Sequence, residues 1–171
     1  LVYGNIIYNK SPIVMEMLVR MLGKEAFQKG IREYLTTYAY GNATWDGLIR
    51  ILDSYTDEDL AAWSEVWVNE KGMPELTATV EGKELVVTQY DSWGRGICWP
   101  QVVTYKVIAA NGDEEDVQVA MSGKSAESRA TLQKVSGEGA VVIPNIDGRA
   151  YGFFRIAEDE QTLKGIIDLL N

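Results

Sequence analysis

The segment Trp67-Val68-Asn69-Glu70-Lys71-Gly72-Met73-Pro74 divides the chain into two parts with different hydrophobic periods. Before it, apolar residues recur every three to four positions, which is the spacing of amphipathic helices. After it, apolar and polar residues alternate, which is the spacing of half-buried strands. Gly72 and Pro74 mark the change, because glycine ends helices and proline cannot extend them. The sequence therefore predicts a boundary near residues 71–75.

The amino-terminal part is predicted to form four helices within residues 12–70. The first, near 12–22, is apolar almost all round, which is typical of a helix buried between others. Ser11 is its expected N-cap and Pro12 its first residue, so Tyr8 should lie on the loop before it.

The other three helices are placed by similar signals. The second is expected over about 24–39, after Gly23 ends the first helix. The third follows a cap at Thr44. The fourth follows Thr56, whose hydroxyl and the carboxylate of Asp59 resemble a capping box.

The carboxy-terminal part shows the period-two alternation of strands, interrupted by short polar turns such as Gly82-Lys83 and Asn111-Gly112-Asp113. Strands are predicted near residues 76–80, 85–88, 101–110, 117–121, 129–135, 139–144 and 151–157. Seven short strands favour a β-sandwich. Residues 158–171 return to helical spacing.

Composition and charge exclude several classes of protein. With 46% hydrophobic and 24% charged residues, the 171-residue chain has the composition of a globular protein. A net charge of −9 without a basic cluster argues against nucleic-acid binding. The apolar stretches are too short for a membrane span, so no membrane contact is evident. One cysteine excludes an internal disulfide, and no pattern indicates a cellular compartment.

Two tyrosines five positions apart, Tyr3 and Tyr8, are the candidate functional residues, and Lys10 follows the second. A phenol that projects into a cavity can donate one hydrogen bond while it stays neutral. Tyrosines beside a helix start are more often packing residues. The motif Tyr-x-Lys therefore has meaning only in a wider context.

That context is a succession of four motifs. They are Tyr8-Asn9-Lys10-Ser11, Leu22-Gly23-Lys24-Glu25-Ala26-Phe27-Gln28-Lys29-Gly30, Tyr40-Gly41-Asn42-Ala43-Thr44, and Trp67 through Pro74. In this order and spacing they resemble the aminopeptidase N family of zinc metallopeptidases, the gluzincins. Ser11 departs from the glycine that the family usually has after the lysine. The resemblance covers residues 3–74 and continues more weakly to the end of the chain.

The resemblance implies an α+β fold in two parts. Residues 1–74 would be the helical end of a gluzincin catalytic domain, and residues 75–157 a seven-stranded, immunoglobulin-like β-sandwich. Residues 158–171 would form a terminal helix, which either packs on the sandwich or begins the family's C-terminal helical domain.

The family's zinc ligands are two histidines and a glutamate that lie upstream of the Tyr-x-Lys motif. This chain has no histidine and one cysteine, Cys98, and carboxylates alone favour calcium or magnesium over zinc. We therefore assign no metal ligand here and expect zinc to be bound by residues before Leu1 in a longer parent protein. The chain alone is expected to be inactive.

In the family, zinc and a glutamate activate water for attack on a peptide bond. The tyrosine that matches Tyr8 donates a hydrogen bond to the resulting oxyanion, and the one that matches Tyr3 lines the pocket for the first substrate side chain. The resemblance thus implies a metallo-aminopeptidase that removes N-terminal residues from peptides. Lys10 has either a structural or a chemical role.

Two other functions remain open from the sequence. The parent could be a zinc-less relative that serves as a scaffold, although intact Tyr3 and Tyr8 argue against it. The β-sandwich could instead be an independent binding module. Its candidate contact patch is the 91–99 loop with Trp93, Cys98 and Trp99, although these side chains are expected rather to pack against the neighbouring helices.

Overall fold

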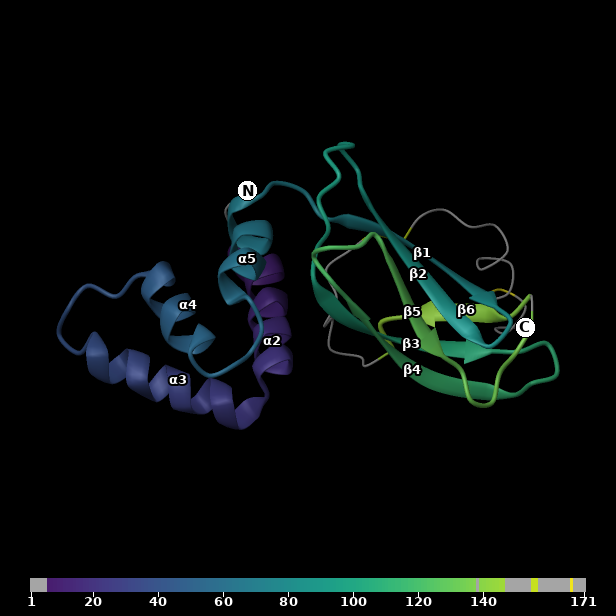
Figure 1. Ribbon diagram of the computed structural model, residues 1–171, viewed down its shortest axis with the longest axis horizontal. Coiled ribbons are helices and arrows are strands. Elements are labelled where there is room, and N and C mark those ends of the chain that lie inside the picture. The colour runs from purple at the N-terminus through teal and green to yellow at the C-terminus, as the bar shows by residue number, and fades with distance from the viewer. Residues whose placement is uncertain (1–5, 138, 147–154, 157–166, 168–171) are drawn as a thin grey trace. The chain divides into compact units, whose positions relative to one another are not determined.

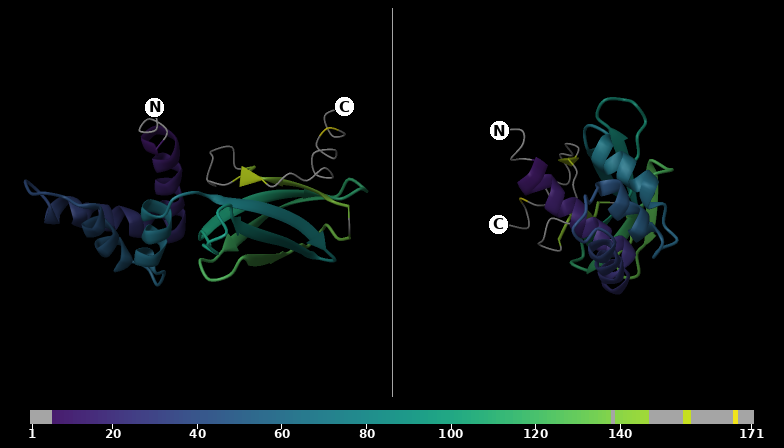
Figure 2. Two further views of the ribbon diagram at one scale, coloured as in Figure 1. Left: turned by 90° about the horizontal axis from the view of Figure 1, so that it is seen from above. Right: turned by 90° about the vertical axis from the view of Figure 1, so that its left-hand side faces the viewer.

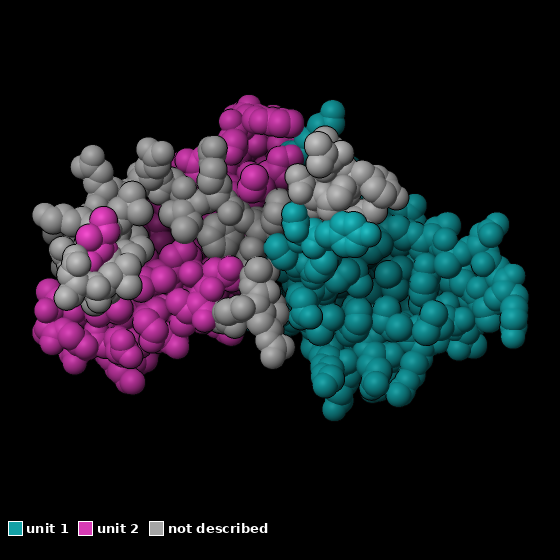
Figure 3. All heavy atoms as spheres, turned by 180° about the vertical axis from the view of Figure 1, so that it is seen from behind, with its two compact units in different colours: residues 1–71 teal, residues 72–171 magenta. Residues whose placement is uncertain are grey.

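The computed structural model describes residues 6–137, 139–146, 155–156 and 167. The chain divides into two compact units, Leu1–Lys71 and Gly72–Asn171, which are coloured separately in Figure 3. The described part of the first unit is helical and that of the second is built of strands (Figure 1). We refer to them as the helical unit and the sandwich unit.

The helical unit contains four α-helices and two π-helical turns among its described residues. These are η1 (Ile6–Lys10), α2 (Ser11–Leu22), α3 (Lys24–Thr37), α4 (Trp45–Asp53), α5 (Leu60–Ser64) and η2 (Glu65–Asn69). As predicted, Gly23 ends α2: it has φ 78°, and its N–H donates to the Val19 carbonyl oxygen at 2.9 Å. The predicted cap of α4 is also confirmed, because the Thr44 hydroxyl accepts from the Gly47 N–H at 3.1 Å.

Two predicted helix starts are wrong. Ser11 is not an N-cap, because Lys10 before it already has helical angles (φ −73°, ψ −48°) and η1 runs directly into α2. Tyr8 consequently lies in a helical turn and not on a loop. Proline at position 12 disfavours a helical conformation in the residue before it but does not forbid one.

The start of α5 differs from the prediction, because carboxylates and not the Thr56 hydroxyl accept from the first N–H groups of the helix. Asp59 accepts from the Ala62 N–H at 2.8 Å, and Asp53 accepts from the Leu60 N–H at 2.9 Å. The Thr56 hydroxyl accepts from the Glu58 N–H within the preceding turn, at 3.2 Å. The capping box predicted at Thr56 is therefore wrong.

The core of the helical unit consists of aliphatic, methionine and tryptophan side chains from α2, α4, α5 and η2. Its buried apolar residues are Val14, Met17, Leu18, Leu48, Ile49, Leu52, Leu60, Trp63 and Trp67. The helix α3 contributes little to this core, because Gly30 is its one buried residue. An added Cβ at Gly30 would press on the Leu52 side chain, so the small residue permits the close approach of α3 to α4.

The sandwich unit consists of two sheets. Its described strands are β1 (Pro74–Glu81), β2 (Glu84–Asp91), β3 (Gln101–Ile108), β4 (Glu114–Met121), β5 (Glu127–Thr131), β6 (Val141–Pro144) and β7 (Arg155–Ile156). One sheet has the order β5-β2-β1-β7 and the other β4-β3-β6. The pairs are antiparallel except β1 with β7, where Leu76 lies opposite Ile156 in a parallel ladder.

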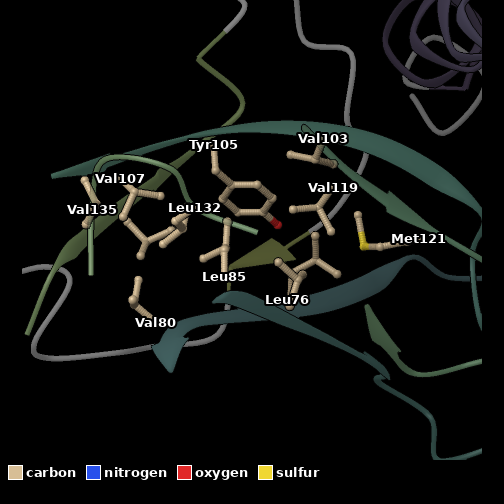
Figure 4. Packing of buried hydrophobic residues seen from close by; sticks show 12 residues of the cluster. Leu76, Val80, Leu85, Val103, Tyr105, Val107, Val119, Met121, Leu132 and Val135 are labelled. Atoms are coloured by element: carbon tan, nitrogen blue, oxygen red, sulfur yellow. The ribbon is translucent and has the colours of Figure 1, made fainter. Parts of the chain in front are cut away.

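A single apolar cluster lies between the two sheets, which stack as layers in Figure 2. Its members are Leu76, Val80, Leu85, Val87, Val103, Tyr105, Val107, Val119, Met121, Leu132, Val135 and Val142. The labelled side chains in Figure 4 point toward one another from both sheets, with the Tyr105 ring among them. This packing is that of a β-sandwich.

Gln89 ties together two loops at one end of the sandwich unit. Its side chain is 2% exposed. The Gln89 amide oxygen accepts from the Trp99 N–H at 2.7 Å, and its amide nitrogen donates to the Ser122 and Ser125 carbonyl oxygens at 3.2 and 3.3 Å. The amide oxygen and nitrogen of Gln89 both have hydrogen-bond partners, so this polar side chain can be buried without an unsatisfied group.

The terminal helix predicted over residues 158–171 lies outside the described residues except at Ile167, as does most of the strand predicted over 151–157. Among the described residues, no helix is long and apolar enough to cross a membrane.

Candidate functional site

Tyr8 lies in η1 with 78% of its surface exposed. Within the described part of the chain its hydroxyl makes no hydrogen bond, so the phenol can donate one to a bound group. Tyr3, the other candidate residue, lies outside the described residues.

Lys10, two residues after Tyr8, is oriented differently. It lines a cavity of about 190 Å³, and Tyr8 is not among the lining residues. Burial lowers the pKa of Lys10, because desolvation disfavours its charged form. The two side chains of the Tyr-x-Lys motif therefore lie in different environments, Tyr8 in solvent and Lys10 at the cavity.

The Lys10 cavity is built by four elements of the helical unit. The end of η1 provides Lys10, the start of α4 provides Trp45, and η2 provides Trp67 and Val68. The first turns of α2 provide Ser11, Val14 and Met15. Trp67 is fully buried, and the indole N–H of Trp45 donates to the Ser64 hydroxyl at 2.7 Å. The tryptophan walls are thus held by the core and by a hydrogen bond.

The sequence treated these tryptophans as core and did not find the cavity. A weak signal was present, because Lys10 and Val14, like Ser11 and Met15, are four apart and share a helix face. That spacing shows which residues of α2 lie together. It does not show that Trp45 and Trp67 lie opposite them.

The described residues of this chain do not fit a catalytic zinc ion. The sequence has no histidine, and no group of three histidine, cysteine or carboxylate side chains among the described residues could hold a metal. Catalytic zinc usually has three protein ligands of these types.

The 91–99 loop exposes only part of the candidate contact patch that the sequence suggested. Trp99 is fully buried, because Gln89 holds its backbone inside the unit. Trp93 is 60% exposed, and the Arg95 guanidinium lies over its ring at 4.7 Å. Cys98 is half-buried, and burial raises the pKa of its thiol.

Asp91 organises this loop. Its carboxylate is almost wholly covered and pairs with Arg95 at 2.9 Å. It also accepts from the backbone N–H groups of Trp93 and Arg95, at 3.1 and 2.8 Å. The hydrogen bond from Arg95 and these backbone donors lower the pKa of Asp91 to about 2.

Comparison with known proteins relates the chain to peptidases. Residues 1–67 match the Peptidase family M1 domain. Aminopeptidase M1-B of Oryza sativa subsp. japonica is 25% identical over 172 residues, covering 96% of this chain and 19% of the relative. Aminopeptidase N of Lactococcus lactis subsp. cremoris is 37% identical over 84 residues, covering 49% of this chain and 10% of the relative.

The fold has a solved counterpart as well. A crystal structure of Legionella pneumophila aminopeptidase A in complex with aspartic acid matches with a TM-score of 0.68 and 19% identity, covering 95% of this chain and 19% of that one. The chain therefore spans less than a fifth of the length of these relatives.

Proposed function

We propose that this chain, whose residues 1–67 match the Peptidase family M1 domain, is a segment of a zinc-dependent aminopeptidase. In this proposal residues 1–74 form the helical end of the peptidase domain, residues 75–157 the following β-sandwich, and residues 158–171 a terminal helix. Zinc and its ligands belong to residues outside this chain, since the residues present do not fit the metal.

The observation that carries the proposal is the placement of Tyr8. Its phenol stands on a helical turn, is 78% exposed, and has the position in the motif succession at which the family has its tyrosine. The backbone of Tyr8 is fixed in a helical turn and its hydroxyl is accessible. This combination suits a residue that donates a hydrogen bond to a bound substrate.

Tyr8 donates its phenolic hydrogen bond to the oxyanion that forms when the scissile carbonyl of a peptide becomes tetrahedral. The negative charge exists only after attack on the carbonyl, so this bond stabilises the transition state and hardly affects substrate binding. Tyr3 lines the pocket for the N-terminal side chain of the peptide and acts on binding. The chain alone, without the metal-binding residues, has no peptidase activity.

The proposal is tested by steady-state kinetics of the longer protein that contains this segment, on a panel of aminoacyl-anilides. Tyr8→Phe should lower kcat on the order of a hundredfold and leave KM nearly unchanged. Tyr40→Phe is the matched control, because Tyr40 is another fully exposed tyrosine of the helical unit. Tyr3→Phe should mainly shift the preference among N-terminal side chains. Wild-type turnover in Tyr8→Phe would reduce Tyr8 to a surface residue.

The division of roles has its own test on the 171-residue chain. After removal of metals with a chelator and reloading with zinc, elemental analysis should find no stoichiometric zinc, and aminoacyl-anilides should not be hydrolysed. One equivalent of tightly held zinc would contradict the assignment of the metal site to other residues.

A further inference from the structure

The Lys10 cavity combines a small volume, aromatic walls and one cationic group, and neither the Tyr8 chemistry nor the family comparison assigns it a ligand. We propose that this cavity is a binding site for a single-ring aromatic carboxylate. The ring lies between the tryptophan and aliphatic walls, and the carboxylate pairs with the Lys10 ammonium group.

The volume sets the size of the ligand. An apolar cavity of about 150 Å³ in another protein holds one benzene molecule, whereas pockets for drug-sized ligands have about 300–1,000 Å³. At about 190 Å³, the Lys10 cavity has room for one ring with a short substituent. Nucleotides and larger cofactors are too large for it.

The walls favour an aromatic ring. Trp45, which is half-buried, offers ring surface for offset or edge-to-face packing, Trp67 lies behind the wall, and the Met15 thioether makes favourable contacts with aromatic rings. Val14 is 5% exposed and closes the apolar side. Trp67 is fully buried and Trp45 is held by Ser64, so the walls are formed before a ligand arrives.

The charge distribution favours an anion. Lys10 is the one charged residue among the described residues that line the cavity, and its charge is opposite in sign to the net charge of −9 of the whole chain. The ammonium group carries three N–H donors and can bind a carboxylate while it keeps another contact, and the Ser11 hydroxyl is a further donor. Charge-assisted hydrogen bonds of this kind strengthen where water is partly excluded.

Phenylacetate is the probe for this site, and the 171-residue chain labelled with ¹⁵N is the sample. The five tryptophans each give one indole N–H signal. We expect saturable shifts at Trp45 and Trp67 with a dissociation constant on the order of 1 mM, as is usual for a ligand of about ten heavy atoms. Trp93, exposed in the sandwich unit, should not shift. Benzyl alcohol should bind about tenfold more weakly, and benzylamine should not bind.

Variants distinguish the contribution of the Lys10 charge to phenylacetate affinity from that of the cavity walls. Lys10→Met should weaken phenylacetate binding by tenfold or more, whereas Lys10→Arg should keep it within about threefold. Lys29→Met, which removes an exposed lysine of α3, is the control that should bind like the unchanged chain. Val68→Trp should abolish binding by filling the cavity, and this position is 45% exposed and tolerant of a larger side chain.

Three results would overturn the proposal. The first is the absence of saturable shifts at Trp45 and Trp67. The second is equal affinity for phenylacetate and benzylamine. The third is a folded Lys10→Met variant that binds phenylacetate as tightly as the Lys10→Arg variant does.

Discussion

The sandwich unit buries a continuous apolar cluster between two sheets, whereas the helical unit leaves much of one long helix unburied. Leu85, Val87 and Val107 are fully buried in the sandwich cluster. In the helical unit, the 14-residue helix α3 buries one glycine, and Leu35 on it is 64% exposed. Most helical stability comes from packing of an apolar face, so the two units should differ in how much of their stability their own contacts supply.

This difference accords with the proposed function. A sandwich that closes its own core can fold as a unit, while a helical segment with exposed tyrosine and leucine side chains is expected to be completed by other residues of the peptidase domain. Tyr8 belongs to the less complete unit, where a site shared with other residues would lie.

The largest effect is expected in the sandwich core. Leu85 is fully buried, so Leu85→Ala should lower the free energy of unfolding of the sandwich unit by about 3 kcal/mol, the sum of lost burial and a residual cavity. Leu35→Ala, at an exposed position of α3, should change stability by less than about 0.5 kcal/mol. Urea titration followed by fluorescence measures both. Equal changes in the free energy of unfolding for Leu85→Ala and Leu35→Ala would contradict the proposed difference in core packing between the two units.

The next effect tests the contact between α3 and α4. An added Cβ at Gly47 would collide with the Tyr38 ring, so Gly47→Ala should destabilise the helical unit by about 1–3 kcal/mol. Gly41→Ala is the matched control, because a Cβ there meets the Tyr38 carbonyl oxygen at an ordinary 3.6 Å. Thermal unfolding followed by the helical circular dichroism signal compares them. A neutral Gly47→Ala variant would mean that Tyr38 does not pack there.

A smaller effect depends on pH. Because the pKa of Asp91 is lowered to about 2 in the folded chain, its stabilising contribution is complete above about pH 4 and is lost as the pH falls toward 2. We expect about 1 kcal/mol of sandwich stability from this group, because its partner Arg95 is partly exposed and solvent screens the pair. Asp91→Asn should flatten the dependence between pH 4 and 2. Denaturant midpoints of both proteins, measured at several pH values, test this. The same pH dependence in the unchanged chain and in Asp91→Asn would contradict it.

Glu115 contributes to the same acid dependence at another place. Burial alone would raise the pKa of Glu115, but the backbone N–H donors of residues 133–135, at 2.8–3.0 Å, outweigh it and leave the pKa lowered. Its contribution is therefore also present above its unfolded pKa and lost on acidification. The double variant Asp91→Asn with Glu115→Gln should be flatter than either single variant.

The smallest effect concerns a buried hydroxyl. The Tyr105 side chain is 1% exposed, its hydroxyl has no hydrogen-bond partner among the described residues, and burial raises the pKa of the phenol. Tyr105→Phe should therefore leave stability unchanged or raise it by up to about 1 kcal/mol, since no bond is lost and desolvation is relieved. A loss of more than about 1 kcal/mol, measured by the same urea titration, would indicate a hydrogen bond through water.

The contrast between the units also explains what the sequence could predict. Strands such as 74–81 and 101–108 were found because alternation and turn residues are local signals. The cap at Ser11 was wrong because the helical turn η1 runs directly into α2. The cap at Thr56 was wrong because Asp53 and Asp59 accept from the first N–H groups of α5 instead. The burial of Trp99 by Gln89 could not be predicted, because this contact joins two loops through a side chain.

The candidate site was predicted in part. The motif succession singled out Tyr8, and its role stays a proposal. The Lys10 cavity could not be predicted, because it requires residues 10–15 to lie opposite Trp45 and Trp67, and such long-range contacts leave no periodic trace in the sequence.

The most direct test of the central claim is a segment exchange. In aminopeptidase N of Lactococcus lactis, the segment that aligns with this chain is replaced by the corresponding residues of this chain, and kcat is measured on aminoacyl-anilides with and without Tyr8→Phe. We predict that the folded chimera hydrolyses these substrates and that Tyr8→Phe lowers its kcat on the order of a hundredfold at nearly constant KM. A folded, active chimera in which Tyr8→Phe leaves kcat unchanged would contradict the account.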